Sequence, residues 1–287
     1  MRLEDYDTGD TYLTRVLSTD RITAEAASED VREIVLEVEH RAFVYEPGQS
    51  IGVIVSGQHA LGHPHHFRLY SIADVQQATP GSNHAQLTLC VRRCHYIDEY
   101  SGETYPGIAS NYLCDRVPGD SVTINGPFGM PFTVPDDREA DLLLIGMGTG
   151  IAPFRALVKH IYRDVPDWRG QISLFYGARS GLEMLYMNDQ RDDFAQYYDK
   201  QTFSAFKALS PRPHWEAPVA IDQAIAQHAV TIKTMLDKPH THIYVAGREQ
   251  MLANLDQVFA NMVGSEEQWA RRRAELQAGK RWLELIY

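Results

Sequence analysis

The sequence predicts two domains, an antiparallel β-barrel in residues 1–137 and an α/β domain with a parallel sheet in residues 138–287. The first half carries short β-rich runs separated by Pro and Gly, which is typical of an antiparallel barrel. The second half alternates strand-like and helical runs, which is typical of a parallel sheet. At 287 residues, the chain is long enough for two separate hydrophobic cores.

The barrel prediction rests on runs rich in β-branched residues and on the turn residues between them. The runs are 31–39, 51–55 and 86–92, and the breaks are Pro47-Gly48, Pro118-Gly119 and Gly126-Pro127. After residue 137 the pattern changes to strands followed by helices. The expected strands are 141–146, 171–177, 202–209 and 242–246, and the expected helices are 153–163, 189–198, 221–236 and 249–262.

Residues 68–71 form the first candidate site. On a strand, alternation places Arg68 and Tyr70 on one face and Leu69 and Ser71 on the other. The run therefore offers a cation and an aromatic ring on one side, with a small hydroxyl close by. An ordinary strand with a snorkelling Arg and a half-buried Tyr is the structural alternative.

A glycine-rich turn over residues 146–150 forms the second candidate site, between a buried-type strand and a helix. Missing Cβ atoms let a phosphate approach the backbone, and the helix N-terminus supplies N–H groups and a positive dipole. Pro153 suits the first helical turn, where no N–H donor is required. The spacing differs from Gly-x-Gly-x-x-Gly, so a purely structural turn is the alternative. Together with residues 68–71, this turn suggests a flavin site and a nicotinamide nucleotide site.

A third segment, residues 107–114, predicts a turn into a short helix where Ser110 and Asn111 either cap the helix or offer N–H groups to a pyrophosphate. In this order, the segments resemble the plant-type ferredoxin–NADP reductase family from about residue 30 to the C-terminus. The resemblance implies an FAD-binding barrel in residues 1–137 and an NAD(P)-binding α/β domain in residues 138–287. The FAD-binding residues that it implies are Arg68, Leu69, Tyr70, Ser71, Cys90, Arg92, Tyr96, Gly107, Ile108, Ala109, Ser110 and Tyr287.

The same resemblance implies roles for the FAD-binding residues. Arg68 would hold the FAD pyrophosphate, Tyr70 would stack on the isoalloxazine, and Ser71 would lie near flavin N5. Arg92 would meet a phosphate, and Tyr96 would stack on adenine. The resemblance therefore divides the FAD site into a ring-binding strand and an adenylate-binding segment.

The resemblance also implies a coenzyme site in the second domain, made by Gly148, Thr149, Gly150, Pro153, Ser210, Arg212, Gly247 and Met251. Ser210 and Arg212 resemble the family's pair for a 2′-phosphate, and no acid replaces them. We therefore expect NADPH, with NADH as the alternative. Tyr287 would cover the flavin until nicotinamide displaces it, and the implied catalytic residues are Ser71, Glu284 and Tyr287.

Three positions around the expected hydride-transfer pocket depart from the family pattern. Ala246 replaces a Cys, Met147 replaces a Thr, and Leu285 replaces a Glu, with Glu284 one residue out of register. The missing thiol and the displaced carboxylate would weaken transition-state positioning more than ground-state binding. We therefore predict slower hydride transfer than is usual for the family, with Ser71 as the remaining polar catalytic residue.

The predicted function is electron exchange between NADPH and a one-electron carrier such as ferredoxin or flavodoxin, through FAD. One alternative is the reductase component of an oxygenase system, and another is a flavin-binding docking subunit without NAD(P)H activity. Within the family, residues 49–52, 64–66 and 107–112 are most similar to the flavin reductase part of benzoyl-CoA epoxidase. The natural electron acceptor would separate the first alternative from a general ferredoxin reductase.

The charge pattern bears on partners. The net charge of −11 argues against nucleic acid binding, which depends on Lys and Arg. Residues 268–281 nevertheless carry a local balance of +4, which predicts either a solvated helix face or a landing site for an acidic partner. The bases of this run are Arg271, Arg272, Arg273, Lys280 and Arg281.

Other features narrow the class of protein. Cys90, Cys94 and Cys114 lack the spacing of a four-cysteine cluster, and the first two predict a buried pair on one strand face. A metal site at His63, His65 and His66 is not expected, because such loops more often supply hydrogen bonds. The acidic start of the chain and the lack of a long apolar run predict no signal peptide, no membrane span and a cytoplasmic location.

Overall fold

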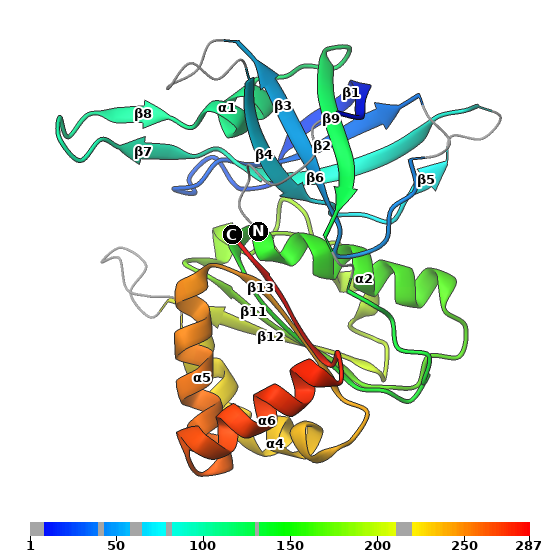
Figure 1. Cartoon of the computed structure of the whole chain (residues 1–287), viewed down its shortest axis with the longest axis vertical. Coiled ribbons are helices and arrows are strands. Elements are labelled where there is room, and N and C mark those ends of the chain that lie inside the picture. Colours follow the sequence, from blue (N-terminus) through cyan, green and yellow to red (C-terminus); the bar gives the residue numbers. More distant parts are fainter. Residues whose placement is uncertain (1–8, 40–42, 58–64, 79–81, 130–131, 211–219) are drawn as a thin grey trace. The chain divides into compact units, whose positions relative to one another are not determined.

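The computed structural model describes residues 9–39, 43–57, 65–78, 82–129, 132–210 and 220–287. The chain forms two compact units (Figure 1). One unit contains Met1–Thr133 and Ala152–His160, and the other contains Val134–Ile151 and Ile161–Tyr287. The chain therefore enters the second unit after Thr133, returns to the first unit at Ala152 and leaves it again after His160.

The first unit is built on an antiparallel sheet, which has seven strands within the described ranges. Their order is β4-β3-β9-β1-β2-β6-β5. A bridge from Ile72, directly after β4, to Leu89 of β6 brings distant strands of this order together. The sheet therefore curls as a barrel does, and the prediction of an antiparallel barrel is confirmed. The strands are β1 (Thr11–Arg21), β2 (Val31–Val38), β3 (Ser50–Ser56), β4 (His65–Ser71), β5 (Gln77–Ala78), β6 (Ala85–Arg92) and β9 (Ser121–Phe128).

The inside of this curled sheet is filled by alternate apolar side chains of its strands. On β2, for example, Ile34 and Leu36 are fully buried, while the intervening Val35 is only partly buried. A short helix, α1 (Ile108–Cys114), adds Ala109 and Leu113 to the same core. The strands β7 (His95–Ile97) and β8 (Thr104–Pro106) pair only with each other among the described strands and form a separate hairpin.

The second unit contains a parallel sheet, which confirms the α/β prediction. Across the described part of the unit, the strand order is β12-β11-β10-β13-β14, and every neighbouring pair is parallel. The chain turns from one side of β10 to the other between β12 and β13, so the crevice for a ligand is expected at the C-terminal ends of β10 and β13. The strands are β10 (Leu142–Met147), β11 (Ile172–Ala178), β12 (Phe203–Leu209), β13 (His242–Gly247) and β14 (Trp282–Ile286).

Helices with one apolar stripe cover a face of this sheet. Leu143 and Ile145 of β10 and Ile243 and Val245 of β13 point alternately toward the same core, which these helices complete. The helices that contribute to this core are α3 (Ile221–Gln227), α4 (Ala229–Asp237), α5 (Glu249–Val263) and α6 (Glu266–Ala278). Helix α2 (Ile151–Asp164) is divided, because its residues Ala152–His160 belong to the first unit. No helix in the described ranges is long and apolar enough to cross a membrane.

Two helix predictions are wrong in detail. Over residues 189–198, the structure has a single 3₁₀ turn, Ala195–Tyr197. Asn188 Oδ1 accepts the backbone N–H groups of Gln190 and Arg191, and this local turn replaces the start of a helix. The helix expected over 221–236 divides at His228 into α3 and α4.

Candidate flavin and nucleotide sites

Strand β4 presents the motif of residues 68–71. Tyr70 is partly buried and packs against the barrel core, and this burial raises the pKa of its phenol further above the physiological range. Arg68 is exposed, and its Nη1 donates to the carbonyl oxygen of Phe67 at 2.8 Å. Leu69 and Ser71 are partly buried. The strand therefore combines a fixed neutral ring with an accessible cation, which fits the ring and phosphate ends of a flavin nucleotide.

The start of α1 is tied to the end of β6. Asn111 Nδ2 donates to the carbonyl oxygens of Cys94 and Gly107, each at 2.8 Å. Ser110 Oγ accepts the N–H of Cys94 at 3.1 Å and donates to the carbonyl of Gly107 at 3.3 Å. Both side chains are thus used to hold the loop, and the helix has no side-chain N-cap. If this loop contacts a pyrophosphate, the backbone N–H groups of Ile108 and Ala109 in the first turn would do so.

The predicted adenylate residues lie around the same loop. Arg92 is partly exposed and pairs with Glu29 at 3.4 Å, an exposed pair that a phosphate can replace. Tyr96 is 56% exposed, and its ring stacks on the ring of Tyr105. Cys90 is buried within β6, whereas Cys94 is only partly buried, so the predicted buried pair is wrong for Cys94.

The glycine turn has the geometry expected of a phosphate-binding turn. Strand β10 ends at Met147, Gly148 has φ +53°, and α2 begins at Ile151 with Pro153 in its first turn. A Cβ on Gly148 would meet nothing within 4 Å, so space above the turn is open. The hydroxyl of Tyr176 donates to the carbonyl of Gly148 at 2.9 Å and fixes the turn. The open turn at the start of a 14-residue helix fits a nucleotide phosphate.

The end of β13 packs tightly against this turn. A Cβ on Gly150 would lie 2.2 Å from the carbonyl oxygen of Ala246, so only glycine permits this approach. Gly247 has φ +157°, and the buried Met251 lies beneath it. The predicted coenzyme residues that follow β10 and β13 are therefore close together at the C-terminal ends of these two strands.

The C-terminal residue, Tyr287, also lies at the C-terminal ends of β10 and β13. The N–H of Tyr287 donates to the carbonyl of Gly247 at 3.1 Å. Thr149 Oγ1 donates to Tyr287 Oη at 2.9 Å, and Tyr287 Oη donates to the carbonyl of Met147 at 3.3 Å. Although 56% exposed, Tyr287 is therefore held on the glycine turn by its hydroxyl.

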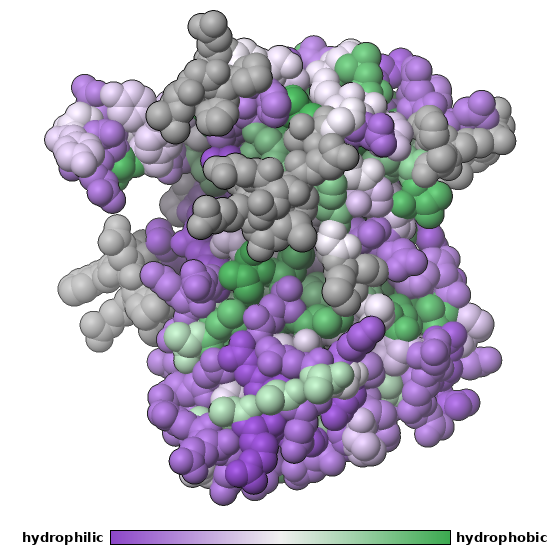
Figure 2. All heavy atoms as spheres, in the orientation of Figure 1, coloured by the Kyte–Doolittle hydropathy of each residue, from purple (hydrophilic) through white to green (hydrophobic). Residues whose placement is uncertain are grey.

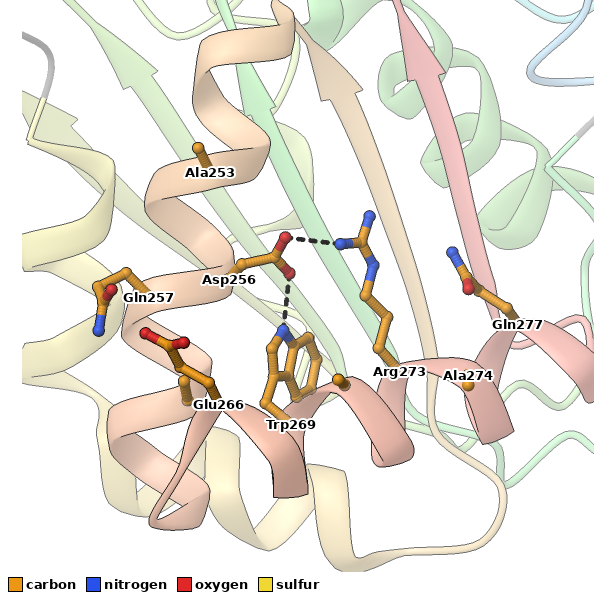
Figure 3. Close-up of a pocket in the computed structure, with 10 residues that line it drawn as sticks. Ala253, Asp256, Gln257, Glu266, Trp269, Arg273, Ala274 and Gln277 are labelled. Atoms are coloured by element: carbon orange, nitrogen blue, oxygen red, sulfur yellow. Dashed lines mark hydrogen bonds and ion pairs between the residues drawn. The ribbon is translucent and has the colours of Figure 1, made fainter.

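Glu284 has a different environment from Tyr287. Its carboxylate accepts hydrogen bonds from Arg273 at 2.6 Å and from Nε1 of Trp282. Arg273 also pairs with Asp256 at 2.6 Å, in a hollow between α5 and α6 (Figure 3). In the β13–β14 pairing, Leu285 is the residue opposite Ala246. These partners do not favour the catalytic role predicted for Glu284, which stays a prediction.

Of the two residues predicted to bind a 2′-phosphate, Ser210 and Arg212, the structure describes only Ser210. Ser210 is buried at the end of β12, where its N–H donates to the carbonyl of Ala178 at 3.3 Å. Arg212 lies outside the described residues, as does His63. In the described ranges, no group of three or more His, Cys, Asp or Glu side chains is arranged to hold a metal ion.

This chain is similar in sequence to proteins of known function. Residues 144–257 match the family model described as an oxidoreductase NAD-binding domain. A ferredoxin–NADP reductase of Thermosynechococcus vestitus is 34% identical over 246 residues, which are 85% of this chain and 64% of that protein's length. The chloroplastic ferredoxin–NADP reductase of Spinacia oleracea is 31% identical over 284 residues, 96% of this chain and 75% of that protein. The chain belongs to the ferredoxin–NADP reductase family.

The fold agrees as well. The solved ferredoxin–NADP+ reductase of Plasmodium falciparum matches 99% of both chains with a TM-score of 0.73, at 16% identity. Two residues that contact predicted site residues were missed from the sequence. Tyr176 donates to the carbonyl of Gly148, and the ring of Tyr105 stacks on that of Tyr96. For Tyr105, the signal was the turn sequence Ser101-Gly102, which predicts a hairpin that pairs it with Tyr96.

The departure at Ala246 gives a testable prediction. Ala246 is fully buried on β13 and its backbone touches the glycine turn, so a thiol at this position would lie next to the predicted coenzyme site. We expect Ala246→Cys to raise the single-turnover rate of hydride transfer by about tenfold, which corresponds to about 1.4 kcal/mol. Rapid mixing with NADPH measures this rate. Ala260→Cys, also buried but on α5, is the control, and an unchanged rate in Ala246→Cys contradicts the explanation.

Proposed function

We propose that this chain exchanges electrons between NADPH and ferredoxin through a bound FAD. The observation that carries the proposal lies at the C-terminal ends of the parallel strands, where hydrogen bonds join the open glycine turn to the terminal Tyr287. Relatives of this chain from cyanobacteria and plants are named ferredoxin–NADP reductases. FAD would supply the conversion between two-electron and one-electron transfer, while the protein supplies binding and orientation.

The residues of the first unit fit a flavin nucleotide. Arg68 and Arg92 are accessible cations for the pyrophosphate and adenylate ends, and the neutral ring of Tyr70 provides a stacking surface. Ser71 supplies a hydroxyl on the same strand. In the second unit, Tyr287 would cover the flavin ring in the absence of nicotinamide. Its two hydrogen bonds to the glycine turn would be broken when a coenzyme phosphate binds there.

NADPH is the proposed coenzyme because the sequence offers Ser210 and Arg212 for a 2′-phosphate and no acid in place of either. The P. falciparum family member was solved with 2'P-AMP, which carries that phosphate. The test is ferredoxin-dependent reduction of cytochrome c, with NADPH or NADH as the electron donor. Activity with NADPH that requires ferredoxin supports the proposal, and activity without ferredoxin dependence contradicts it.

The finer part of this proposal is a docking face formed by α6 and by Lys280, which follows this helix. Two bases of the basic run 268–281 form ion pairs within the chain: Arg272 pairs with Glu275 at 3.2 Å, and Arg273 pairs with Asp256 and Glu284. Arg281 donates to the carbonyl of Thr241. Arg271 and Lys280 are exposed, and no ion pair involves either within the described ranges. We therefore assign the contact with an acidic ferredoxin or flavodoxin to these two side chains.

Charge reversal tests this face. We expect Arg271→Glu with Lys280→Glu to slow ferredoxin reduction about fivefold at low salt, because repulsion lowers the association rate. The difference should shrink at about 0.5 M salt, where screening is strong. Lys233→Glu on α4 is the control for reversing the charge of an exposed base away from this face. Equal ferredoxin kinetics in the double variant and the control would remove α6 from the interface.

The comparisons give no support to the oxygenase-reductase and docking-subunit alternatives. The closer similarity to the flavin reductase part of benzoyl-CoA epoxidase and the cytoplasmic location stay predictions. A relative from Nicotiana tabacum is described as chloroplastic, so family membership alone does not assign a compartment.

A further inference from the structure

The hairpin of β7 and β8 presents two tyrosine rings to solvent. Tyr96 and Tyr105 are directly opposite each other in the strand pairing, which places their side chains on the same face. The ring centroids are 5.7 Å apart with 25° between the planes, so the rings are stacked. Their exposed fractions are 56% and 39%. A stacked and accessible pair of rings is a flat surface that a planar ligand can extend.

Hydrogen bonds fix this hairpin at both ends although its strands are exposed. At its base, the N–H of Gly107 donates to the carbonyl of Cys94 at 2.9 Å. At its tip, Asp98 Oδ1 accepts the N–H groups of Tyr100 and Ser101, and these bonds lower the pKa of Asp98. The tyrosine pair is therefore carried by an ordered turn, not by packing against another sheet.

The orientation of Tyr105 is fixed by a further bond. Its hydroxyl donates to Glu103 Oε2 at 2.5 Å, and this bond raises the pKa of Tyr105, which keeps the ring neutral at physiological pH. A ring held in one orientation restricts the ring of Tyr96 that stacks on it. Ordering an exposed side chain in advance removes an entropic cost from ligand binding.

The charge of the hairpin indicates what kind of ligand it takes. Residues 95–106 contain three acids, Asp98, Glu99 and Glu103, and neither Lys nor Arg. Figure 2 shows this hairpin, at the upper left, mainly in purple and pale tones, so it is not an extended apolar patch. An acidic protein would be repelled here, and an apolar protein surface would find little to cover. A flat, neutral base with its phosphate directed to a nearby cation fits better.

We propose that Tyr105 is a positioning residue for the adenine of FAD, acting through Tyr96. Adenine would stack on Tyr96 with Tyr105 behind it, and Arg92, four residues before Tyr96, would meet the adenylate phosphate. This inference rests on the proposed FAD-dependent function. It makes the hairpin selective for the adenylate half of the cofactor, so Tyr105 contributes to the preference for FAD over FMN.

The test compares FAD with FMN, which lacks the adenylate half. Dissociation constants of flavin-depleted full-length protein are measured by fluorescence titration with each flavin. We expect Tyr105→Leu to weaken FAD binding about fivefold, in line with the strength of an aromatic pair, and to leave FMN binding within about twofold. Tyr105→Phe keeps the ring and loses only the bond to Glu103, so it should weaken FAD binding by no more than about twofold.

Tyr100→Leu is the matched control, because Tyr100 is a fully exposed tyrosine at the tip of the same hairpin. Unchanged FAD binding in Tyr105→Leu would overturn the inference, and so would equal losses for FAD and FMN, which would indicate general damage to the flavin domain. If the unaltered protein binds neither flavin, the proposed function itself fails. If it binds FAD and Tyr105→Leu binds it equally well, only the role of Tyr105 fails.

Discussion

Replacing Arg155 by Met is expected to lower the free energy of unfolding by about 3–5 kcal/mol, the usual cost of breaking a buried ion pair by removing one partner. Arg155 Nη1 donates to the carbonyl of Ala73 at 2.7 Å and lies 3.2 Å from Asp74. Its Nη2 lies 3.6 Å from Glu33. All three charged side chains are less than 10% exposed. Methionine would fill much of the space but remove the cation that Glu33 and Asp74 share, while Asp74 keeps its pair with Lys159 at 2.8 Å.

The same helix provides the control for this prediction. Arg163 also pairs with a carboxylate, that of Asp164 at 2.7 Å, but its side chain is 45% exposed. Arg163→Met should therefore change the free energy of unfolding by less than about 1 kcal/mol. Urea titrations followed by circular dichroism measure both variants. Equal stabilities for Arg155→Met and Arg163→Met would show that burial of the Arg155 cluster has no energetic consequence.

Replacing Gly150 by Ala is expected to weaken NADPH binding by about ten- to a hundredfold. The new Cβ would lie 2.2 Å from the carbonyl oxygen of Ala246 and 2.6 Å from its carbonyl carbon. Backbone atoms cannot rotate away, so the glycine turn must move from β13. Overpacking typically costs about 1–3 kcal/mol, and the middle of this range corresponds to about ten- to a hundredfold in affinity. The flavin should remain bound, because Arg68 and Tyr70 belong to the other unit.

Gly181→Ala is the matched control for Gly150→Ala. Gly181 is also in a 3₁₀ turn of the second unit, and a Cβ there would meet nothing within 4 Å. Its NADPH affinity should equal that of the unaltered protein. Equilibrium titration of the flavin spectrum with NADP+ measures both variants without turnover. Unaltered affinity in Gly150→Ala would mean that the turn does not bind the coenzyme phosphate.

Elements with local causes could be predicted from the sequence. The apolar run 141–146, the glycines that follow it and Pro153 together specify a strand, an open turn and a helix start, and the structure has all three. The parallel sheet followed from the alternation of strands and helices. The helix expected at 189–198 failed because the side chain of Asn188 competes for backbone N–H groups, which helix periodicity does not register.

Among the site residues, too, some features could be predicted from local sequence and others could not. The period of a strand already implies that Glu284 and Leu285 point to opposite faces, so the separation of Glu284 from the Ala246 side could have been predicted. The cluster of Arg155 with Asp74 and Glu33 could not, because its members are far apart in sequence and no local pattern relates them. The stack of Tyr105 on Tyr96 required the exact register of a short hairpin, which the sequence leaves open.

Anaerobic stopped-flow mixing of the flavin-loaded protein with NADPH, and separately with NADH, tests the central claim most directly. Absorbance at about 450 nm follows reduction of the flavin. The proposed function predicts rapid bleaching by NADPH and much slower bleaching by NADH. A protein that carries FAD but is bleached by neither nucleotide would contradict the claim that the glycine turn and Tyr287 form a working coenzyme site.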